Sequence, residues 1–410
     1  MTERPPIAAI IALGLTQIIG YGTLYYSFSI LAPGMSRDLG WPSEAVFGAL
    51  SAALLIGGLT APALGKWIDR FGAGRIMTAG SAIAAVALTA CALVPGRISF
   101  VVALIGIEIA SNLVQYGAAF ALLVQIRPQA AQRSITYLTL IGGFASTIFW
   151  PITTMLHAEM SWQQIYLVFA GLNLLICLPI HAVLSRQMRR NRERSGKASP
   201  TKRVEGTLAA SARRTGFVLM ALSFSLQSLV SSAILVHMVP LLSGLGLGAT
   251  AALVGTFFGP SQVLSRFTNM LFGGNLPPLK LAIIAAMLLA AAVFLLIPTA
   301  PSVVGAIAFA VVFGLGNGLF SIVTGTLPLM LFGSDGYGKL QGRVMAARLI
   351  VSATAPFALA YMMGAIGVVW SLALTSAAGG LAVLVLAAIG RLATNVYASE
   401  MKAEEAASAT

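Results

Sequence analysis

The chain has very little charge. Asp, Glu, Lys and Arg make up 9% of its 410 residues, whereas 58% are hydrophobic and the mean hydropathy is +0.90. Soluble domains carry roughly 25% charged residues, so this composition excludes a water-facing globular surface. Cysteine is also scarce. Cys91 and Cys177 both lie in apolar runs, so neither a disulfide framework nor a metal cluster can be read from them. We expect no metal and no cofactor.

Long apolar runs occupy nearly the whole length of the sequence. A membrane span needs about 20 predominantly apolar residues, and the sequence supplies about twelve such runs. Their length excludes the short alternating strands of a transmembrane barrel. We therefore predict an all-α membrane protein with twelve transmembrane helices, near residues 7–32, 45–64, 76–94, 99–125, 135–156, 165–184, 215–243, 249–272, 281–299, 303–332, 344–364 and 367–390.

The basic residues are distributed asymmetrically around these spans. With the N-terminus inside, the outside loops contain only Arg37 and Arg97. Every other Lys and Arg except Arg266 falls in inside segments, and we place Arg348 in this group. The positive-inside rule then predicts a multi-pass protein of the cytoplasmic (inner) membrane with both termini cytoplasmic. Topology explains the net charge of +13, so the expected partner is the lipid bilayer and not nucleic acid.

One long polar segment interrupts the apolar pattern. Residues 185–214 are rich in Arg and Lys and predict a basic cytoplasmic linker. They divide the chain into an N-terminal six-helix half (1–184) and a C-terminal six-helix half (215–390), followed by a cytoplasmic tail (391–410). This is the layout of transporters built from two pseudo-symmetric halves. The first apolar run is too long for a signal-peptide core, so no cleaved targeting segment is expected.

The loop between spans two and three reads "GKWIDRFGAGR". It resembles the loop signature of the major facilitator superfamily, with one extra residue before the last Arg. The resemblance implies the major facilitator fold and a conformational latch made by Gly65, Asp69, Arg70 and Arg75. Gly65 allows close helix approach, and the charged side chains can pair or cap at helix ends.

Three ionisable residues lie at bilayer depth, where a charge costs about 2.5–3.5 kcal/mol and indicates function. These are Glu108, His237 and Arg266. Polar side chains recur at helical spacing in the spans around them, including Gln17 and Tyr21 in span one and Asn112 and Tyr116 in span four. We expect these stripes to face a central cavity. Hydrogen bonding between helices without substrate contact is the alternative.

Arg266 keeps its charge at any accessible pH, so it needs either a fixed anion or a visiting one. Permanent pairing with Glu108 and binding of an anionic substrate both remain open. His237, Pro240 and Arg266 resemble the second-half pattern of the monocarboxylate-porter group, in which the Arg engages the substrate carboxylate. Many members carry Asp one turn before the Arg, where this chain has Gln262. Proton coupling would then fall to Glu108 or His237.

The leading hypothesis is a secondary active transporter that moves a small organic anion by alternating access and proton symport. The substrate-binding candidates are Arg266, His237, Tyr116, Tyr21 and Gln262. Efflux of a drug, metalloid or other toxic compound, and uptake of a larger compound such as a vitamin, remain alternatives. A membrane enzyme or sensor is disfavoured because only one acid lies within the spans. We expect the protein to function as a monomer.

Overall fold

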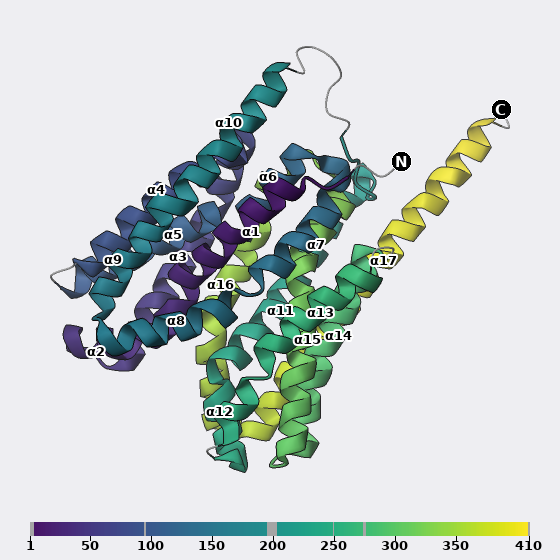
Figure 1. Ribbon diagram of the computed structural model, residues 1–410. Helices are drawn as coiled ribbons and strands as arrows, with labels where there is room; N and C mark the ends of the chain where they lie inside the picture. The colour runs from purple at the N-terminus through teal and green to yellow at the C-terminus, as the bar shows by residue number, and fades with distance from the viewer. Residues whose placement is uncertain (1–3, 94–95, 195–202, 249, 274–275, 409–410) are drawn as a thin grey trace. The chain divides into compact units, whose positions relative to one another are not determined.

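The computed structural model describes residues 4–93, 96–194, 203–248, 250–273 and 276–408 (Figure 1). Over these residues the chain is almost entirely helical, and eleven helices are long and apolar enough to cross a membrane. The predicted all-α membrane fold is confirmed.

The described residues of the N-terminal part form ten α-helices and three short helices of other types. Their bounds are α1 Ile7–Tyr21, the π-helix η1 Gly22–Tyr26, α2 Ser27–Leu39, α3 Ser43–Phe71, α4 Ala73–Ala92, α5 Arg97–Val114, α6 Tyr116–Ile126, the 3-10 helix η2 Pro128–Ala130, α7 Ala131–Gly142, α8 Ala145–Glu159, α9 Trp162–Leu172, the π-helix η3 Asn173–Cys177 and α10 Leu178–Arg194.

In the C-terminal part, the residues that the structure describes form seven α-helices and two short helices of other types. Their bounds are the 3-10 helix η4 Ala210–Ala212, α11 Arg213–Leu242, the π-helix η5 Ser243–Leu247, α12 Thr250–Gly255, α13 Phe258–Phe272, α14 Pro278–Thr299, α15 Val303–Phe332, α16 Tyr337–Ile366 and α17 Val368–Ser408. Helices α14 and α15 run side by side, as the green ribbons of Figure 1 show.

The chain packs into two compact units. The first contains Met1–Arg203 and Gly336–Ala353, and the second contains Val204–Asp335 and Thr354–Thr410. Helix α16 therefore belongs to both units, because its first part packs with the N-terminal helices. The halves predicted from the sequence follow chain order alone, so they place the whole of α16 in the C-terminal half.

Each unit has an apolar core in which aromatic rings pack against one another. In the first unit Trp162 lies against Phe100, with ring centroids 6.2 Å apart. In the second unit Phe224 contacts Phe320 at 5.6 Å, and Phe309 contacts Phe313 at 5.7 Å. Such pairs bury large apolar surfaces and fix the distance between neighbouring helices.

The predicted eighth span, 249–272, is broken into α12 and α13. Thr256 and Phe257 form a turn between them, held by bonds of 3.1 Å from their N–H groups to the carbonyls of Leu253 and Val254. Pro260 explains the break, because it lacks an N–H and its ring would clash with the carbonyl of Thr256 in a continuous helix. Neither piece alone is long enough to span a membrane, which is why eleven helices satisfy that length and not twelve.

The predicted linker begins as a helix. Helix α10 continues to Arg194, and residues 195–202 lie outside the described residues. The segment after them pairs with the end of α15: Thr207 and Leu208 donate backbone N–H bonds of 2.9 and 3.1 Å to Met330 and Leu331. The end of the linker is thereby fixed on the second unit.

Candidate functional site

The first and fourth spans, both in the first unit, depart from regular α-helix. The first span passes through the π-helix η1, which contains Tyr25 and Tyr26. The fourth span breaks at Gln115, whose backbone is extended (φ −79°, ψ −169°) between α5 and α6. The side-chain Nε2 of Gln17 donates to the carbonyl of Val114 at 2.8 Å, which satisfies one of the groups released by the break. Irregular backbone inside a span is typical of transporter binding sites.

A cluster of tyrosines lies at these two distortions. The rings of Tyr21 and Tyr116 are 4.8 Å apart, and those of Tyr25 and Tyr26 are 5.2 Å apart. Tyr21 forms a hydrogen bond with the backbone of Tyr116. The ring centroids of Tyr26 and Trp150 are 5.9 Å apart. The structure thus brings together the two predicted tyrosines, Tyr21 and Tyr116. We call Tyr21, Tyr25, Tyr26 and Tyr116 the tyrosine cluster.

Glu108 lies near this cluster on α5 and is 8% exposed. One turn along, Asn112 donates its Nδ2 to the carbonyl of Gly57 at 3.1 Å, so α5 packs closely on α3. Tyr25 is close enough to Glu108 for an electrostatic interaction. Among the described residues of its unit, no hydrogen bond or ion pair reaches the Glu108 carboxyl. A buried acid in this state is suited to taking up and releasing a proton.

Arg348 lies on α16, in the part of this helix that packs with the first unit. It interacts electrostatically with Tyr21 and Tyr25 of the tyrosine cluster. The sequence placed it with the basic residues of the inside segments, because Lys339 and Arg343 precede it. Its interaction with the two tyrosines was not expected from the sequence.

Arg266 is the basic residue that the sequence analysis singled out. It lies on α13 of the second unit and is 5% exposed. Its Nε donates to the Ser321 hydroxyl at 3.0 Å and to the Gly318 carbonyl at 3.3 Å. Its Nη2 donates to Oε1 of Gln262 at 3.1 Å. All three partners are neutral oxygens, and within the described part of this unit Nη1 donates to none.

The predicted partner Gln262 is therefore in contact with Arg266, in the position where an acid was expected. Its Oε1 also accepts from Nδ2 of Asn317 at 3.3 Å, which fixes the amide orientation. A Cβ on Gly318 would clash with the Ser265 hydroxyl, so α13 and α15 touch at this level because Gly318 has no side chain. Ser321 and Asn317 were not identified from the sequence, because their role depends on the pairing of α13 with α15.

His237, the other candidate of the second half, lies on α11. Its Nε2 donates to the backbone carbonyl of Pro356 at 2.9 Å, which joins α11 to α16 within the second unit. Since the carbonyl can only accept, this bond assigns the proton to Nε2. None of the contacts of His237 described in this unit involves Arg266. Its role in substrate binding or coupling stays a prediction.

Asp69 of the superfamily-like loop caps helix α16. Its Oδ1 accepts the N–H of Gly338 at 2.8 Å, and its Oδ2 accepts the N–H of Lys339 at 2.7 Å. A carboxylate at a helix N-terminus satisfies free N–H groups and interacts favourably with the helix dipole. Gln125 holds the loop from the other side, through Nε2 to the Ile68 carbonyl (3.3 Å) and Oε1 to the Ala73 N–H (2.9 Å).

The other predicted latch residues divide into two kinds. Gly65 lies against α16, where a Cβ on it would clash with the Gly338 carbonyl. Arg70 is exposed and lies over the ring of Phe71, 5.2 Å from its centroid, and Arg75 is exposed near the start of α4. Of the four predicted latch residues, Gly65 and Asp69 therefore make the contact with α16.

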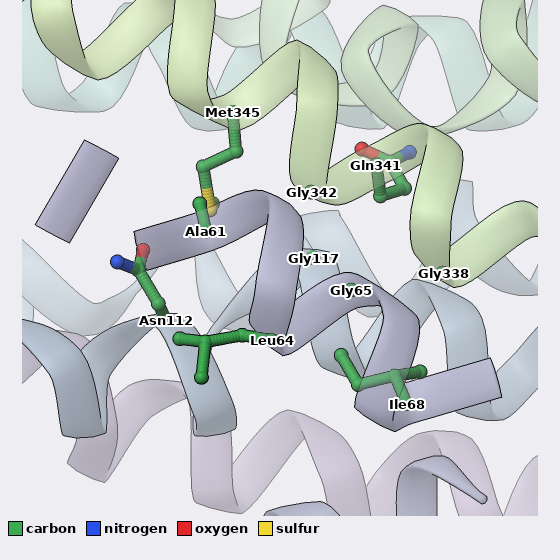
Figure 2. A pocket seen from close by; sticks show the side chains of 10 residues that line it. All are labelled: Ala61, Leu64, Gly65, Ile68, Asn112, Gly117, Gly338, Gln341, Gly342 and Met345. Carbon is green, nitrogen blue, oxygen red and sulfur yellow. The ribbon is translucent and has the colours of Figure 1, made fainter. Parts of the chain in front are cut away.

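A small pocket of about 10 Å³ opens beside this contact (Figure 2). No charged side chain lines it, and four of its lining residues are glycines. Figure 2 shows Gly65 on one helix and Gly338 and Gly342 on the other, with Asn112 and Met345 at the opposite end from Ile68. The pocket results from close glycine packing and has no group that binds an anion. Its lining residues are Ala61, Leu64, Gly65, Ile68, Asn112, Gly117, Gly338, Gln341, Gly342 and Met345.

No curated protein sequence matches this chain. Solved structures with the same fold include the human organic anion transporter MFSD10 (TETRAN), with a TM-score of 0.70 and 14% identity over 93% of this chain and 100% of that one. The proton:xylose symporter XylE gives 0.71 and 14% over 92% and 95%, and the E. coli fucose:proton symporter FucP gives 0.69 and 14% over 95% and 99%.

At these identities the structural likeness shows the fold alone. The sequence itself identifies the family, because the profile of the Major Facilitator Superfamily matches residues 13–356. This chain belongs to the Major Facilitator Superfamily and is a multi-pass membrane transporter, not an enzyme.

Proposed function

We propose that this transporter carries a small organic anion of the monocarboxylate type by alternating access, with Arg266 as the anchor for the anion. The observation that carries the proposal is the set of Arg266 contacts. Ser321, Gly318 and Gln262 hold the guanidinium in place through neutral oxygens and leave its charge without compensation from them. A fixed guanidinium with spare N–H groups binds a carboxylate through two parallel bonds.

The solved structures with the same fold belong to transporters of different substrates. The human protein MFSD10 is an organic anion transporter, and its whole length aligns with this chain. XylE and FucP are proton symporters of sugars, so the same fold also serves neutral substrates. The anionic substrate of this chain is inferred from Arg266 and not from the fold.

Proton coupling is the second part of the proposal. Glu108 is the better candidate of the two predicted groups, because it is buried and its carboxyl forms no hydrogen bond among the described residues of its unit. His237 already donates to Pro356, and it retains one ring nitrogen for a proton. Symport of a proton with the anion would make the transported charge zero for a monocarboxylate.

The proposal places the protein as a monomer in the cytoplasmic (inner) membrane with both termini cytoplasmic. It rests on the distribution of Lys and Arg, of which only Arg37 and Arg97 fall in the expected outside loops. Reporter enzymes fused to either terminus should be active on the cytoplasmic side only.

The test is ligand-dependent thermal stabilisation of the purified protein, followed by counterflow in proteoliposomes. A ligand that binds only the folded protein adds about 2.7 kcal/mol of stability at one hundred times its Kd. A panel of carboxylates should raise the melting temperature, whereas neutral drugs, metalloid species and vitamins should not. Stabilisation by one of these other classes alone would support efflux or vitamin uptake.

The substitution Arg266→Gln should weaken carboxylate binding about ten- to a hundredfold, because it removes charge-assisted bonds worth about 1.5–3 kcal/mol. The matched control is Arg189→Gln, which removes one positive charge from an exposed position on α10. Unchanged carboxylate transport by the Arg266 variant would overturn the proposal.

A further inference from the structure

Asn317 lies near the middle of α15, in the second unit, and its side chain is partly exposed. It carries the only amide side chain of this helix. Polar side chains in the middle of a span are costly and often functional. The Nδ2 of Asn317 donates to Oε1 of Gln262 at 3.3 Å, and Gln262 in turn contacts Arg266. Asn317 is therefore part of the group of side chains around the guanidinium.

The guanidinium of Arg266 sets the orientation of both amides. An arginine has only donors, so the Gln262 atom that Nη2 reaches at 3.1 Å is the amide oxygen. Asn317 approaches the same oxygen at 3.3 Å, so it does so with its NH2 group. The charge thus decides between two amide orientations that have the same shape. As a result, the Asn317 Oδ1 and the Gln262 Nε2 are the ends of these amides that the bonds leave free.

The free groups around Arg266 are unequal in kind. Within the described part of the second unit, Nη1 of Arg266 and Nε2 of Gln262 donate to no acceptor. Ser321 is already used, because its hydroxyl accepts from Arg266 at 3.0 Å and donates to the Gly318 carbonyl at 2.7 Å. Among these described side chains, Oδ1 of Asn317 is the one oxygen that receives no hydrogen bond. A carboxylate can pair with the donors, but it has no proton for this oxygen.

Close backbone packing holds this group in place. Gly314 and Gly318 lie one turn apart on α15, and both face α13. A Cβ on Gly314 would clash with the Phe258 carbonyl, and a Cβ on Gly318 would clash with the Gln262 carbonyl. The two helices are therefore in backbone contact on either side of the hydrogen-bonded amides. A site fixed in this way loses little freedom when a ligand binds.

We propose that Asn317 is a specificity-determining residue, whose Oδ1 accepts a hydrogen bond from a hydroxyl of the substrate while Arg266 binds the substrate carboxylate. The substrate class is then a small carboxylate with a hydroxyl on its second or third carbon. Arg266 and Asn317 bond to one oxygen of Gln262, so a single small molecule can reach both. A ligand without a hydroxyl leaves Oδ1 unpaired once water is excluded, which costs affinity.

This inference rests on the proposed function, because it narrows the substrate from small organic anions to hydroxylated ones. A purely supporting role for Asn317 predicts different behaviour. In that case Asn317 only holds Gln262 against Arg266, and its substitution weakens every carboxylate by the same factor. The ratio of affinities between ligands therefore separates the two roles.

The experiment compares four probes on the purified full-length protein by isothermal titration. They are propanoate, 2-hydroxypropanoate, 3-hydroxypropanoate and 2-methoxypropanoate, the last of which keeps the oxygen but has no proton to donate. We expect the better of the two hydroxy acids to bind about two- to tenfold more tightly than propanoate, as one neutral hydrogen bond predicts. The methoxy acid should bind no more tightly than propanoate.

Variants then assign the preference to a residue. Asn317→Leu has a similar volume and no acceptor, so the ratio between the hydroxy acid and propanoate should fall to about one. Asn317→Ala should do the same, and it serves if the leucine variant does not fold. The matched control is Ser321→Ala, which removes a bond to the guanidinium from the same helix. That variant should weaken all the carboxylates and leave the ratio unchanged.

Three outcomes overturn the inference and leave the proposed function intact, provided that binding still depends on Arg266. They are hydroxy acids that bind no more tightly than propanoate, a methoxy acid that binds as tightly as the hydroxy acids, and a ratio that survives both Asn317 variants. Failure of every carboxylate to bind, or indifference of carboxylate binding to Arg266→Gln, overturns the proposed function and the inference with it.

Discussion

The carboxylate of Asp69 on α3 accepts the N–H of Gly338 at 2.8 Å, near the first residue of α16. With the second bond to Lys339, one acid of the loop after span two caps the eleventh span from another part of the chain. The two residues are 269 positions apart, so this contact closes a long loop of the fold. Its release would free two backbone N–H groups at once.

Asp69→Asn should destabilise the first unit by about 0.5–2 kcal/mol, the usual contribution of a capping side chain and its charge. The amide retains one acceptor and loses the charge. The melting temperature in detergent and the transport rate should both fall. Glu159→Gln, which neutralises an exposed acid at the end of α8, is the control and should change neither. An Asp69→Asn variant with wild-type stability and transport would exclude a latch.

Gly65→Ala should be strongly destabilising. Its Cβ would clash with the carbonyl of Gly338, and the close approach of α3 and α16 leaves no flexible atom to move aside. We expect a lower melting temperature and reduced transport. Gly48→Ala, on the same helix, is the matched control because nothing lies within 4 Å of its Cβ. That variant should be neutral, or more stable by up to about 1 kcal/mol through helix propensity.

Gln262→Glu should weaken anion binding. The substitution keeps the length of the side chain and places a negative oxygen where Oε1 now accepts from Arg266 at 3.1 Å. The guanidinium would then have a fixed anion, and the substrate would compete with it. Isothermal titration should show a Kd increase of about tenfold or more, since a charge-assisted bond is worth about 1.5–3 kcal/mol. Gln132→Glu, an exposed site on α7, repeats the charge change as the control.

Glu108→Gln should separate transport from the proton gradient. The amide cannot take up a proton, so accumulation driven by a pH gradient should stop while counterflow exchange of the anion continues. Glu108→Asp keeps an acid and should retain part of the accumulation. Proteoliposomes with an imposed pH gradient provide the measurement. Gradient-driven accumulation by the glutamine variant would show that another group, with His237 the remaining candidate, carries the proton.

The class of the fold could be predicted because the features that indicate it lie in short stretches of the sequence. Apolar runs of span length and the asymmetry of Lys and Arg need no knowledge of distant contacts, and the loop from Gly65 to Arg75 identified the superfamily. The break in the eighth span was not predicted, although Pro260 is visible in the sequence. In a membrane span proline often bends a helix without ending it, so its presence alone did not decide the outcome.

The candidate site was only partly predictable. Arg266 and Gln262 share one helix face, and their contact follows from a spacing of four residues. Tyr21 and Tyr116 were chosen separately, and only the fold brings their rings within 4.8 Å. The interaction of Arg348 with Tyr21 and Tyr25 was not predicted, because a basic residue near the start of a span resembles a topology signal.

The π-helix at Gly22–Tyr26 has a consequence for the register of the first span. Each residue of an α-helix turns the next by about 100°, so one extra residue in a turn rotates everything that follows by that angle. The tyrosines before and within η1 therefore lie on a different face of the helix from Phe28, Leu31 and Met35. Those three residues are buried in the apolar core. Deleting Leu24 would restore a regular helix and turn one of these two faces away from its neighbours. The first span therefore consists of two helical segments whose faces are rotated relative to each other. Insertions or deletions in this span should be tolerated less well than substitutions, because they change that rotation.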